Sequence, residues 1–293
     1  MNLQFYFMSN LTRRLLLTPS VISLLLWMIV PLGMTLYFSF MRYNLLYPER
    51  FGFTGLLNYE FFLTDPAIWP SVLNTLLLVG SVVIVTCILG IMFAVLLQSP
   101  FRGRGIVRVM LISPFFIMPT VNALIWENLF LNPVYGFFAF ISNSLGLPVI
   151  EWLSELPLFS IIMMVTWQWT PFALLIFMTS LQSIDKEQIE AAEIDGASEW
   201  NKFVYLTIPH LLRPIAIVVM IQTIFHLSLF AEIFVTTSGG PGYQSTNVAF
   251  LIFAQALMQF DAGIASAGGV FAIILANVVA IFLIRQVGKS LML

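Results

Sequence analysis

The sequence predicts an all-α membrane protein with six transmembrane helices and both termini in the cytoplasm. Of its 293 residues, 60% are hydrophobic and 9% are charged, and the mean hydropathy is +0.97. Soluble domains carry about 25% charged residues, so this composition is typical of a protein that crosses the bilayer several times. The single cysteine, Cys87, lies in an apolar run, which excludes a disulfide framework and a cysteine-based metal site.

Six apolar stretches are long enough to cross about 30 Å of hydrocarbon. The predicted spans are residues 15–41, 72–98, 109–126, 156–184, 211–235 and 263–284. The first span follows Arg13 and Arg14, as a signal peptide would. It is too long for an apolar region of about 7–15 residues and lacks a small-residue cleavage site, so we interpret it as retained. Pro114 and Pro119 predict a kink in the third span.

The distribution of the basic residues predicts the orientation of the spans. Ten of the twelve Lys and Arg residues fall on one side, and they are Arg13, Arg14, Arg102, Arg104, Arg108, Lys186, Lys202, Arg213, Arg285 and Lys289. Only Arg42 and Arg50 fall on the other side. The positive-inside rule therefore places both termini, and the loop of residues 185–209, in the cytoplasm.

Residues 185–209, called the charged loop below, interrupt an otherwise apolar sequence. Asp185 predicts the cap of a first short helix, and Gly196 predicts a sharp turn after it. Ser198 predicts the cap of a second short helix, which we expect Pro209 to end. The charged loop is therefore predicted to be a compact projection of two helices that docks on a soluble partner.

The charged loop resembles the EAA loop of ABC importer permeases. The resemblance rests on Glu190-Ala191-Ala192, on Gly196 four residues later, and on Leu206-Thr207-Ile208-Pro209, at the spacing of the family pattern. Leu206 and Ile208 stand where the family has Ile and Leu. The resemblance implies that the loop couples the chain to a separate ATPase subunit through six residues: Glu190, Ala191, Ala192, Asp195, Gly196 and Pro209. An ordinary amphipathic cytoplasmic hairpin is the alternative.

Other segments resemble the carbohydrate branch of these permeases, which includes maltose, lactose and glycerol-phosphate types. The loop from Thr237 to Thr246 matches the T-x-G-G-P…T segment of that branch. Its remaining landmarks are matched by Gly55-Leu56-Leu57-Asn58-Tyr59, Asp65-Pro66 and Asn74-Thr75. The resemblance implies the type I (MetI-like) permease fold, in a single transmembrane domain over residues 1–293.

Polar groups inside the spans are the candidate solute contacts, because they are costly in a bilayer. Gln222 and His226 are four residues apart and share one helical face. Amides, an imidazole and aromatic rings suit the hydroxyl groups and C–H faces of a sugar. Counted from Pro171 and from the T-x-G-G-P segment, the resemblance implies solute contacts at Gln168, Trp169, Phe172, Gln222, Phe225 and His226. Hydrogen bonding between helices is the alternative for Gln222 and His226.

The chain lacks a glycine-rich phosphate-binding loop of the G-x-x-x-x-G-K-[ST] type. We therefore expect a transporter subunit and not an enzyme, with ATP and magnesium bound by a partner ATPase and no cofactor or metal on this chain. The resemblance implies a second homologous permease, an ABC ATPase homodimer and an extracytoplasmic sugar-binding protein as partners in a bacterial inner membrane. No nucleic acid is expected.

The predicted spans carry no Lys or Arg at their centres to hold a phosphate or carboxylate, so they favour a neutral sugar or sugar alcohol. A glycerol-phosphate importer is the alternative within the family. An ion-coupled secondary carrier that uses Glu232 and His226 is the alternative from another class of transporter.

Overall fold

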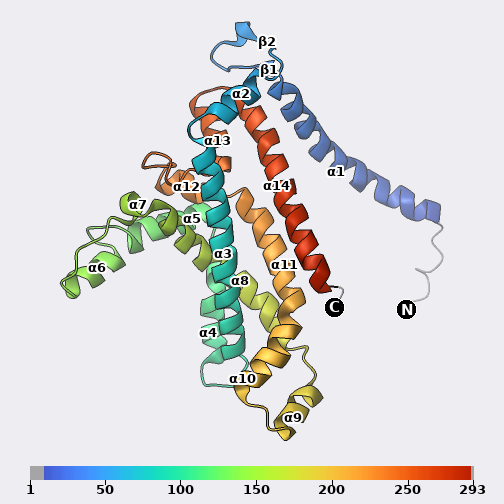
Figure 1. The fold of residues 1–293 in the computed structure, drawn as a ribbon, viewed down its shortest axis with the longest axis vertical. Helices are drawn as coiled ribbons and strands as arrows, with labels where there is room; N and C mark the ends of the chain where they lie inside the picture. Colours follow the sequence, from blue (N-terminus) through green and yellow to red (C-terminus); the bar gives the residue numbers. More distant parts are fainter. Residues whose placement is uncertain (1–9, 292–293) are drawn as a thin grey trace. The chain divides into compact units, whose positions relative to one another are not determined.

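The computed structural model of the protein describes residues 10–291, with side chains described for residues 16–185 and 187–285. Within that range the chain is mostly helical (Figure 1). Five helices are long and apolar enough to cross a membrane. They are α1 (Asn10–Ser39), α3 (Ile68–Leu96), α8 (Pro157–Leu181), the continuous helix Glu199–Leu227, and α14 (Ala262–Leu291). The number is six if the bent pair described below is one span.

Shorter elements connect these helices. The strands are β1 (Met41–Arg42) and β2 (Gly52–Phe53), and the 3-10 helices are η2 (Pro48–Arg50) and η3 (Ser113–Phe116). The α-helices are α2 (Leu57–Thr64), α4 (Arg104–Ile112), α5 (Pro119–Ile125), α6 (Phe137–Ser144), α7 (Trp152–Glu155), α9 (Lys186–Ile194), α10 (Glu199–Lys202), α11 (Ile208–Leu227), α12 (Ala231–Thr236) and α13 (Val248–Phe253). The π-helical turns are η4 (Trp126–Phe130), η5 (Phe203–Thr207) and η6 (Ala254–Met258).

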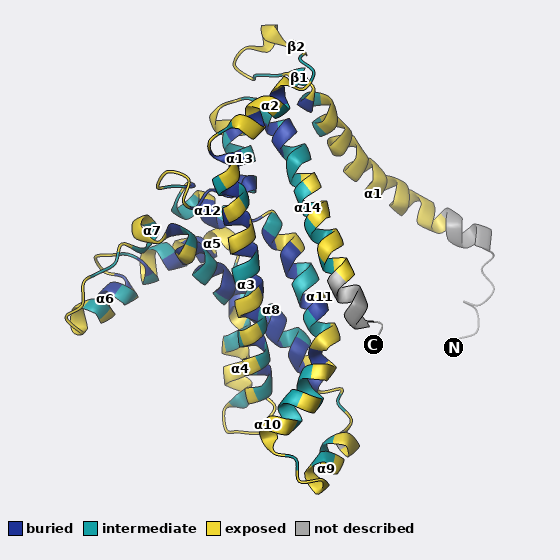
Figure 2. Ribbon diagram, viewed as in Figure 1, coloured by how far each residue is buried: buried dark blue, intermediate teal, exposed yellow. Residues whose placement is uncertain are grey.

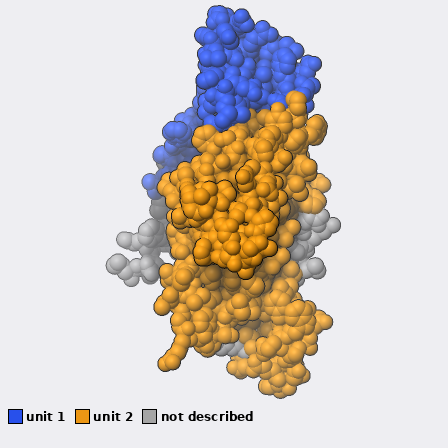
Figure 3. All heavy atoms as spheres, turned by 90° about the vertical axis from the view of Figure 1, so that its left-hand side faces the viewer, with its two compact units in different colours: residues 1–65, 252–271 blue, residues 66–251, 272–293 orange. Residues whose placement is uncertain are grey.

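Contacts between residues group the chain into two compact units (Figure 3). Unit 1 comprises residues 1–65 and 252–271, and unit 2 comprises residues 66–251 and 272–293. Each unit has its own hydrogen bonds between distant segments, and each is described by itself below. The interpretation of residues 1–293 as one permease domain stays a prediction.

The core of unit 2 lies where α3 packs against α8, and the facing sides of both helices are buried (Figure 2). Gly90 of α3 allows this close approach. A Cβ atom at Gly90 would lie 2.8 Å from the Cβ of Ala173 and 3.1 Å from the backbone nitrogen of Leu174. Small residues at such crossings let helix backbones come together inside a membrane. Leu211 of α11 joins the same buried cluster beside Phe177.

The third predicted span, residues 109–126, is broken, as its prolines predict. The helical segments Arg104–Phe116 and Pro119–Phe130 meet at an angle of 110°. Met118 between them is extended, with φ −64° and ψ 142°, because the ring of a following proline disfavours the helical conformation. The kink is therefore confirmed, and it is much sharper than a bend within one continuous helix.

The fifth predicted span, residues 211–235, is wrong as one continuous helix. Helix α11 ends at Leu227, and the chain resumes helical structure only in α12. The backbone carbonyl of Leu229 in the gap accepts a hydrogen bond of 2.6 Å from the side-chain amide of Asn247. A polar side chain from a distant loop thus satisfies the carbonyl that the helix end leaves free, which makes the break tolerable inside the protein.

Asn74 and Thr75 join α3 by hydrogen bonds to the loop that precedes α13 and to the first residue of α13. The amide of Asn74 donates to the backbone carbonyls of Tyr243, at 2.8 Å, and Thr246, at 2.9 Å. The hydroxyl of Thr75 accepts from the backbone N–H of Val248 at 3.0 Å. These contacts explain physically why Asn and Thr stand together at this point of the sequence.

Side-chain amides also join separate segments of unit 1 by hydrogen bonds. The amide of Asn58 donates to the carbonyls of Ser39, at 3.0 Å, and Met41, at 2.8 Å, which ties α2 to the end of α1. The carboxylate of Asp65 accepts from the side-chain amide of Gln255 at 2.9 Å. Four of the landmark residues thus hold loops and helix ends by hydrogen bonds: Asn58, Asp65, Asn74 and Thr75.

Candidate functional site

The charged loop folds as two short helices, α9 and α10, and both predicted caps are confirmed. The carboxylate of Asp185 accepts a hydrogen bond of 3.1 Å from the backbone N–H of Glu187. The hydroxyl of Ser198 accepts one of 3.2 Å from the N–H of Asn201. Each cap satisfies an N–H group at a helix start that has no partner within the helix. In unit 2 the two helices project beyond the ends of α8 and α11 (Figure 1).

The predicted turn at Gly196 is also confirmed. Gly196 has a φ of +75°, a left-handed backbone conformation that residues other than glycine rarely adopt. Its N–H donates to the carbonyl of Glu193 at 3.0 Å, and the N–H of Ala197 donates to the carbonyl of Ala192 at 2.9 Å. These two bonds form a Schellman motif, which ends α9 and turns the chain towards α10. A Cβ at Gly196 would meet no atom within 4 Å, so glycine is required by backbone conformation and not by space.

Lys202 joins the two helices of the charged loop. Its ammonium group lies 2.9 Å from a carboxylate oxygen of Glu193 in α9 and 2.6 Å from one of Glu199 in α10. Exposed ion pairs stabilise weakly one by one, but this lysine closes a network across the turn. The turn and the lysine together link α9 to α10.

The charged loop presents a largely exposed surface (Figure 2). Five of the six predicted coupling residues are exposed and Ala192 is half-buried; the five are Glu190, Ala191, Asp195, Gly196 and Pro209. Two large apolar side chains stand beside them: Ile194 is 87% exposed and Trp200 is 70% exposed. Bulky apolar groups next to charged ones, held on a rigid loop, are typical of a contact surface for another protein.

The prediction that Pro209 ends the second helix is wrong. Helix α10 continues through the π-helical turn η5 into α11, and Pro209 stands in the first turn of α11. The N–H of Ile208 donates to the carbonyl of Phe203, five residues earlier, so the backbone is wider at this point. The wider turn accommodates the proline ring, which would clash in a regular helix.

His210 connects the base of the charged loop to the neighbouring span. Its Nε2 atom lies 3.0 Å from the carbonyl oxygen of Ser180, in the last turn of α8, and 3.2 Å from the hydroxyl of Ser183. The start of α11 is thereby tied to the end of α8. A displacement of the charged loop therefore acts on both helices.

The two glutamines predicted to contact the solute are buried and hydrogen-bonded between helices. The amide nitrogen of Gln168 donates to the carbonyl of Ile117 at 2.6 Å, and its oxygen accepts from the amide of Asn122 at 3.0 Å. Gln168 therefore holds α8 against both sides of the break in the third span. Both ends of its amide are therefore hydrogen-bonded within this fold.

Gln222 has a similar environment on α11. Its side-chain oxygen accepts a hydrogen bond of 2.6 Å from the hydroxyl of Thr86 on α3, and its nitrogen lies 3.4 Å from the carbonyl of Trp169 on α8. The side chain of Gln222 is fully buried. Three helices therefore meet at one amide, which fits the interhelical alternative, and solute contact by Gln222 stays a prediction.

The other four predicted solute contacts form an aromatic cluster with Phe115 of η3. This aromatic cluster is centred on Trp169, whose indole lies 5.7 Å from the ring of Phe115, 5.8 Å from Phe172, 5.2 Å from Phe225 and 4.8 Å from His226. Phe225 is 57% exposed, so the cluster has an open side. The Nε2 atom of His226 is buried and has no hydrogen-bond partner among the described residues. A role of the cluster in solute contact stays a prediction.

Three residues of this region are absent from the sequence-based prediction. Thr86 and Asn122 are the partners of the two glutamines, and Phe115 completes the aromatic cluster. Thr86 and Asn122 carry a usable signal, because each is a polar residue within an apolar span. Phe115 carries no such signal, because its position beside Trp169 depends on the break in the third span.

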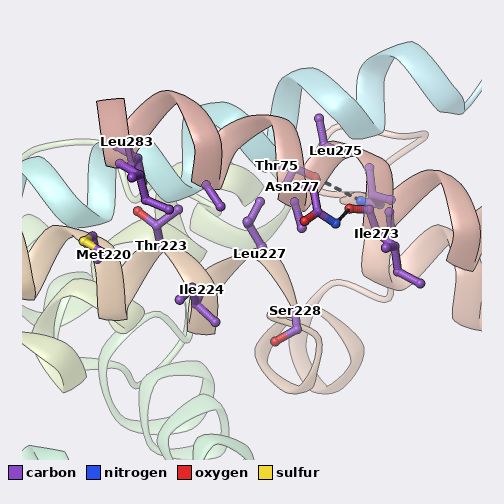
Figure 4. Close-up of a pocket in the computed structure, with 15 residues that line it drawn as sticks. Thr75, Met220, Thr223, Ile224, Leu227, Ser228, Ile273, Leu275, Asn277 and Leu283 are labelled. Carbon is purple, nitrogen blue, oxygen red and sulfur yellow. Dashed lines mark hydrogen bonds between the residues drawn. The ribbon is translucent and has the colours of Figure 1, made fainter. Parts of the chain in front are cut away.

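Unit 2 also has two apolar hollows. One of about 420 Å³ lies between α11 and the part of α14 from Ala272 onward, and Ile224, Leu227 and Ile273 are in its wall (Figure 4). The other, of about 480 Å³, lies between α3, α4 and α8, with Trp167 in its wall. Neither is lined by any of the six predicted solute-contacting residues. The aromatic cluster, and not these hollows, therefore carries the solute-contact prediction.

Known proteins resemble the chain in sequence and in fold. The chain is 36% identical over 247 residues to a probable ABC transporter permease protein, y4oQ, of Sinorhizobium fredii, covering 84% of this chain and 80% of that one. It is 35% identical over 243 residues to the trehalose/maltose transport system permease protein MalF of Thermococcus litoralis, covering 82% and 81%.

A solved structure of a bacterial ABC transporter involved in the import of the acidic polysaccharide alginate contains a chain of the same fold. The TM-score is 0.80 at 21% identity, and the match covers 96% of this chain and 97% of that chain. A family model described as binding-protein-dependent transport system inner membrane component matches residues 2–292. The chain therefore belongs to the family of inner membrane components of binding-protein-dependent transport systems, and the permease family predicted from the charged loop is confirmed.

Proposed function

We propose that the protein is the permease subunit of an ABC importer that moves a neutral sugar or sugar alcohol into the cytoplasm. A solute-binding protein delivers the solute from outside, and two ATPase subunits bind and hydrolyse ATP. A second, homologous permease completes the pathway. Both termini and the charged loop lie on the cytoplasmic side of the bacterial inner membrane, in accordance with the positive-inside rule.

The observation that carries the proposal is the construction of the charged loop. The loop has capped helices, a left-handed glycine turn and a lysine that joins both helices, and it presents Ile194 and Trp200 to the solvent. A projection with a defined turn and exposed apolar anchors is suited to sit in a groove of another protein. The bond from His210 to Ser180 ties this projection to two spans, so a push on the loop reaches the helix bundle.

The aromatic cluster supports a sugar as the solute. Aromatic faces pack against the C–H faces of sugar rings, and Phe225 leaves one side of the cluster open. In the described part of the chain the one cation–π contact joins Arg50 to Tyr47, and it lies outside the cluster. A cluster without a cationic partner favours a neutral solute over a phosphorylated one. Relatives named as trehalose/maltose and trehalose permeases support a sugar as the solute.

In the proposed mechanism, ATP closes the ATPase dimer and displaces the charged loops of both permeases. Each loop transmits the displacement to α8 and α11, which changes the side from which the pathway is open. Such coupling requires two discrete packing arrangements of the bundle that the ATPase and the solute-binding protein favour differently. The broken third span and the gap after α11 are places where backbone conformation can change locally.

Reconstitution tests this proposal. Proteoliposomes with both permeases, the ATPase and internal Mg-ATP should take up a neutral sugar or polyol only when the loaded solute-binding protein is added outside. Liposomes that lack the ATPase should show no uptake, and a protonophore should have no effect. Uptake by this chain alone that disappears with the protonophore would instead identify an ion-coupled carrier. Competition by glycerol phosphate would place the solute in the alternative class.

A further inference from the structure

Unit 1 contains a short, firmly held hairpin. Strands β1 and β2 pair antiparallel, with Met41 opposite Phe53 and Arg42 opposite Gly52. The N–H of Thr54 donates to the carbonyl of Phe40 at 2.9 Å, which closes the base of the hairpin. The amide of Asn58 donates to the carbonyls of Ser39 and Met41, which fixes the segment that leads into β1. This backbone is therefore a fixed platform and not a loose loop.

Two arginines line one hollow on this platform. The hollow has a volume of about 500 Å³, and Arg42 and Arg50 contribute its charged groups. Gly52 and Thr54 of the hairpin also line it. Its lining includes no acidic residue. Arg42 is exposed and makes no ion pair with any described residue. The hollow is thus a concave surface with unsatisfied positive charge.

The charge of Arg50 is only weakly compensated. Its Nε atom lies 3.9 Å from a carboxylate oxygen of the adjacent Glu49, and both side chains are about two-thirds exposed. Exposed pairs of this kind contribute about 0–1 kcal/mol and are easily exchanged for another partner. The guanidinium group also lies 4.9 Å from the ring centre of Tyr47, which holds it in place while leaving its N–H donors available.

Large apolar side chains surround the two arginines. Phe53 is 79% exposed and Leu56 is 67% exposed, and Phe51 is exposed as well. Arginine beside aromatic residues on a rigid backbone is the composition of binding hot spots between proteins. The guanidinium fork also matches a carboxylate with two parallel hydrogen bonds.

We propose that the hollow between Arg42 and Arg50 receives an acidic side chain of the extracytoplasmic solute-binding protein, with Phe53 as the apolar anchor beside it. The inference rests on the proposed function, since it uses the predicted orientation that places these two bases outside. A rigid concave site fits a carboxylate held on a folded protein surface. A fluid layer of anionic lipid headgroups could bind exposed arginines without a rigid concave site. The contact sets the docking position of the binding protein and speeds its association by electrostatic attraction.

The test uses the assembled transporter in nanodiscs of neutral phosphatidylcholine. The measured quantity is the concentration of loaded solute-binding protein that gives half-maximal stimulation of ATP hydrolysis. For the double variant Arg42→Glu/Arg50→Glu we expect this concentration to rise about tenfold at low salt, and the difference to shrink as salt screens the charges. Basal hydrolysis without the binding protein should stay at the wild-type rate.

Two control variants distinguish the effect of the lost positive charge from a general disturbance of the structure of unit 1. Arg42→Lys/Arg50→Lys keeps both charges and should recover most of the affinity, and Glu60→Gln changes an exposed charge elsewhere in unit 1 and should have no effect. A Lys substitution at one acidic position of the binding protein should restore docking on the Glu/Glu variant. An unchanged half-maximal concentration in the Glu/Glu variant overturns the proposal.

Two further outcomes are informative. If the arginines act only on lipid, the effect of the Glu/Glu variant will appear when anionic phosphatidylglycerol is added and be absent in phosphatidylcholine, which also overturns the proposal. If the proposed function itself is wrong, the wild-type assembly will show no stimulation by any binding protein. That result is distinct from a failure of the two arginines alone.

Discussion

Gly196→Val should reduce ATP-driven uptake at least tenfold while the protein still inserts and assembles. A β-branched residue at a φ of +75° is strained by roughly 1–3 kcal/mol, so α9 cannot end in its Schellman turn. The second helix then leaves the first at a different angle, and the exposed Ile194 and Trp200 no longer form one surface. Uptake in proteoliposomes, compared with the amount of assembled complex, measures the effect.

Gly196→Asn is the control for this experiment. Asparagine tolerates the left-handed conformation better than other side chains, and a Cβ at this position meets no neighbouring atom. The Asn variant should therefore keep most of the wild-type uptake. If the Val variant transports at the wild-type rate, the shape of the turn is irrelevant to coupling and the role given to the charged loop is wrong.

Gln222→Leu should lower the free energy of unfolding by about 0.5–1.5 kcal/mol, because the hydroxyl of Thr86 loses its acceptor on α11 at 2.6 Å and keeps only the carbonyl of Val83, at 3.1 Å. The double variant Thr86→Val/Gln222→Leu removes both polar partners and should recover most of the lost stability. Thermal unfolding in detergent, recorded for each single variant and for the double variant, gives the coupling between the two residues. Thr179→Val is the control, since that hydroxyl only bonds within its own helix, to Leu175.

Uptake by the same variants decides between the two interpretations of Gln222. If the residue serves only to join helices, uptake by the double variant should return along with stability. A double variant that is stable and assembled but still fails to transport would show that the amide contacts the solute. That outcome would contradict the structural role that the hydrogen bonds indicate.

Much of the helix arrangement could be predicted from the sequence, because local chemistry determines it. The apolar stretches, the caps at Asp185 and Ser198 and the left-handed glycine all act within a few residues of themselves. The kink in the third span follows from the two prolines in the same way. For these elements no distant contact overrides the local preference.

The error at the end of α11 arises where a distant residue decides the backbone, whereas the error at Pro209 has a local cause. The end of α11 at Leu227 depends on Asn247, whose amide donates a hydrogen bond to the carbonyl of Leu229. A contact between residues so far apart cannot be predicted from the local sequence pattern. Pro209 does not stop its helix because a π-helical turn lies just before it. For the candidate site, the sequence shows that Gln168 is polar and within a span but not that Asn122 occupies its amide.

A photo-crosslinking amino acid at position 194 tests the central claim most directly. Ile194 is 87% exposed on the charged loop, and Phe53 on the hairpin of unit 1 is 79% exposed, so the two positions form a matched pair. Irradiation of the assembled transporter should join the residue at position 194 to the ATPase subunit and the residue at position 53 to no ATPase. An adduct with the ATPase from position 53, or none from position 194, would contradict the account.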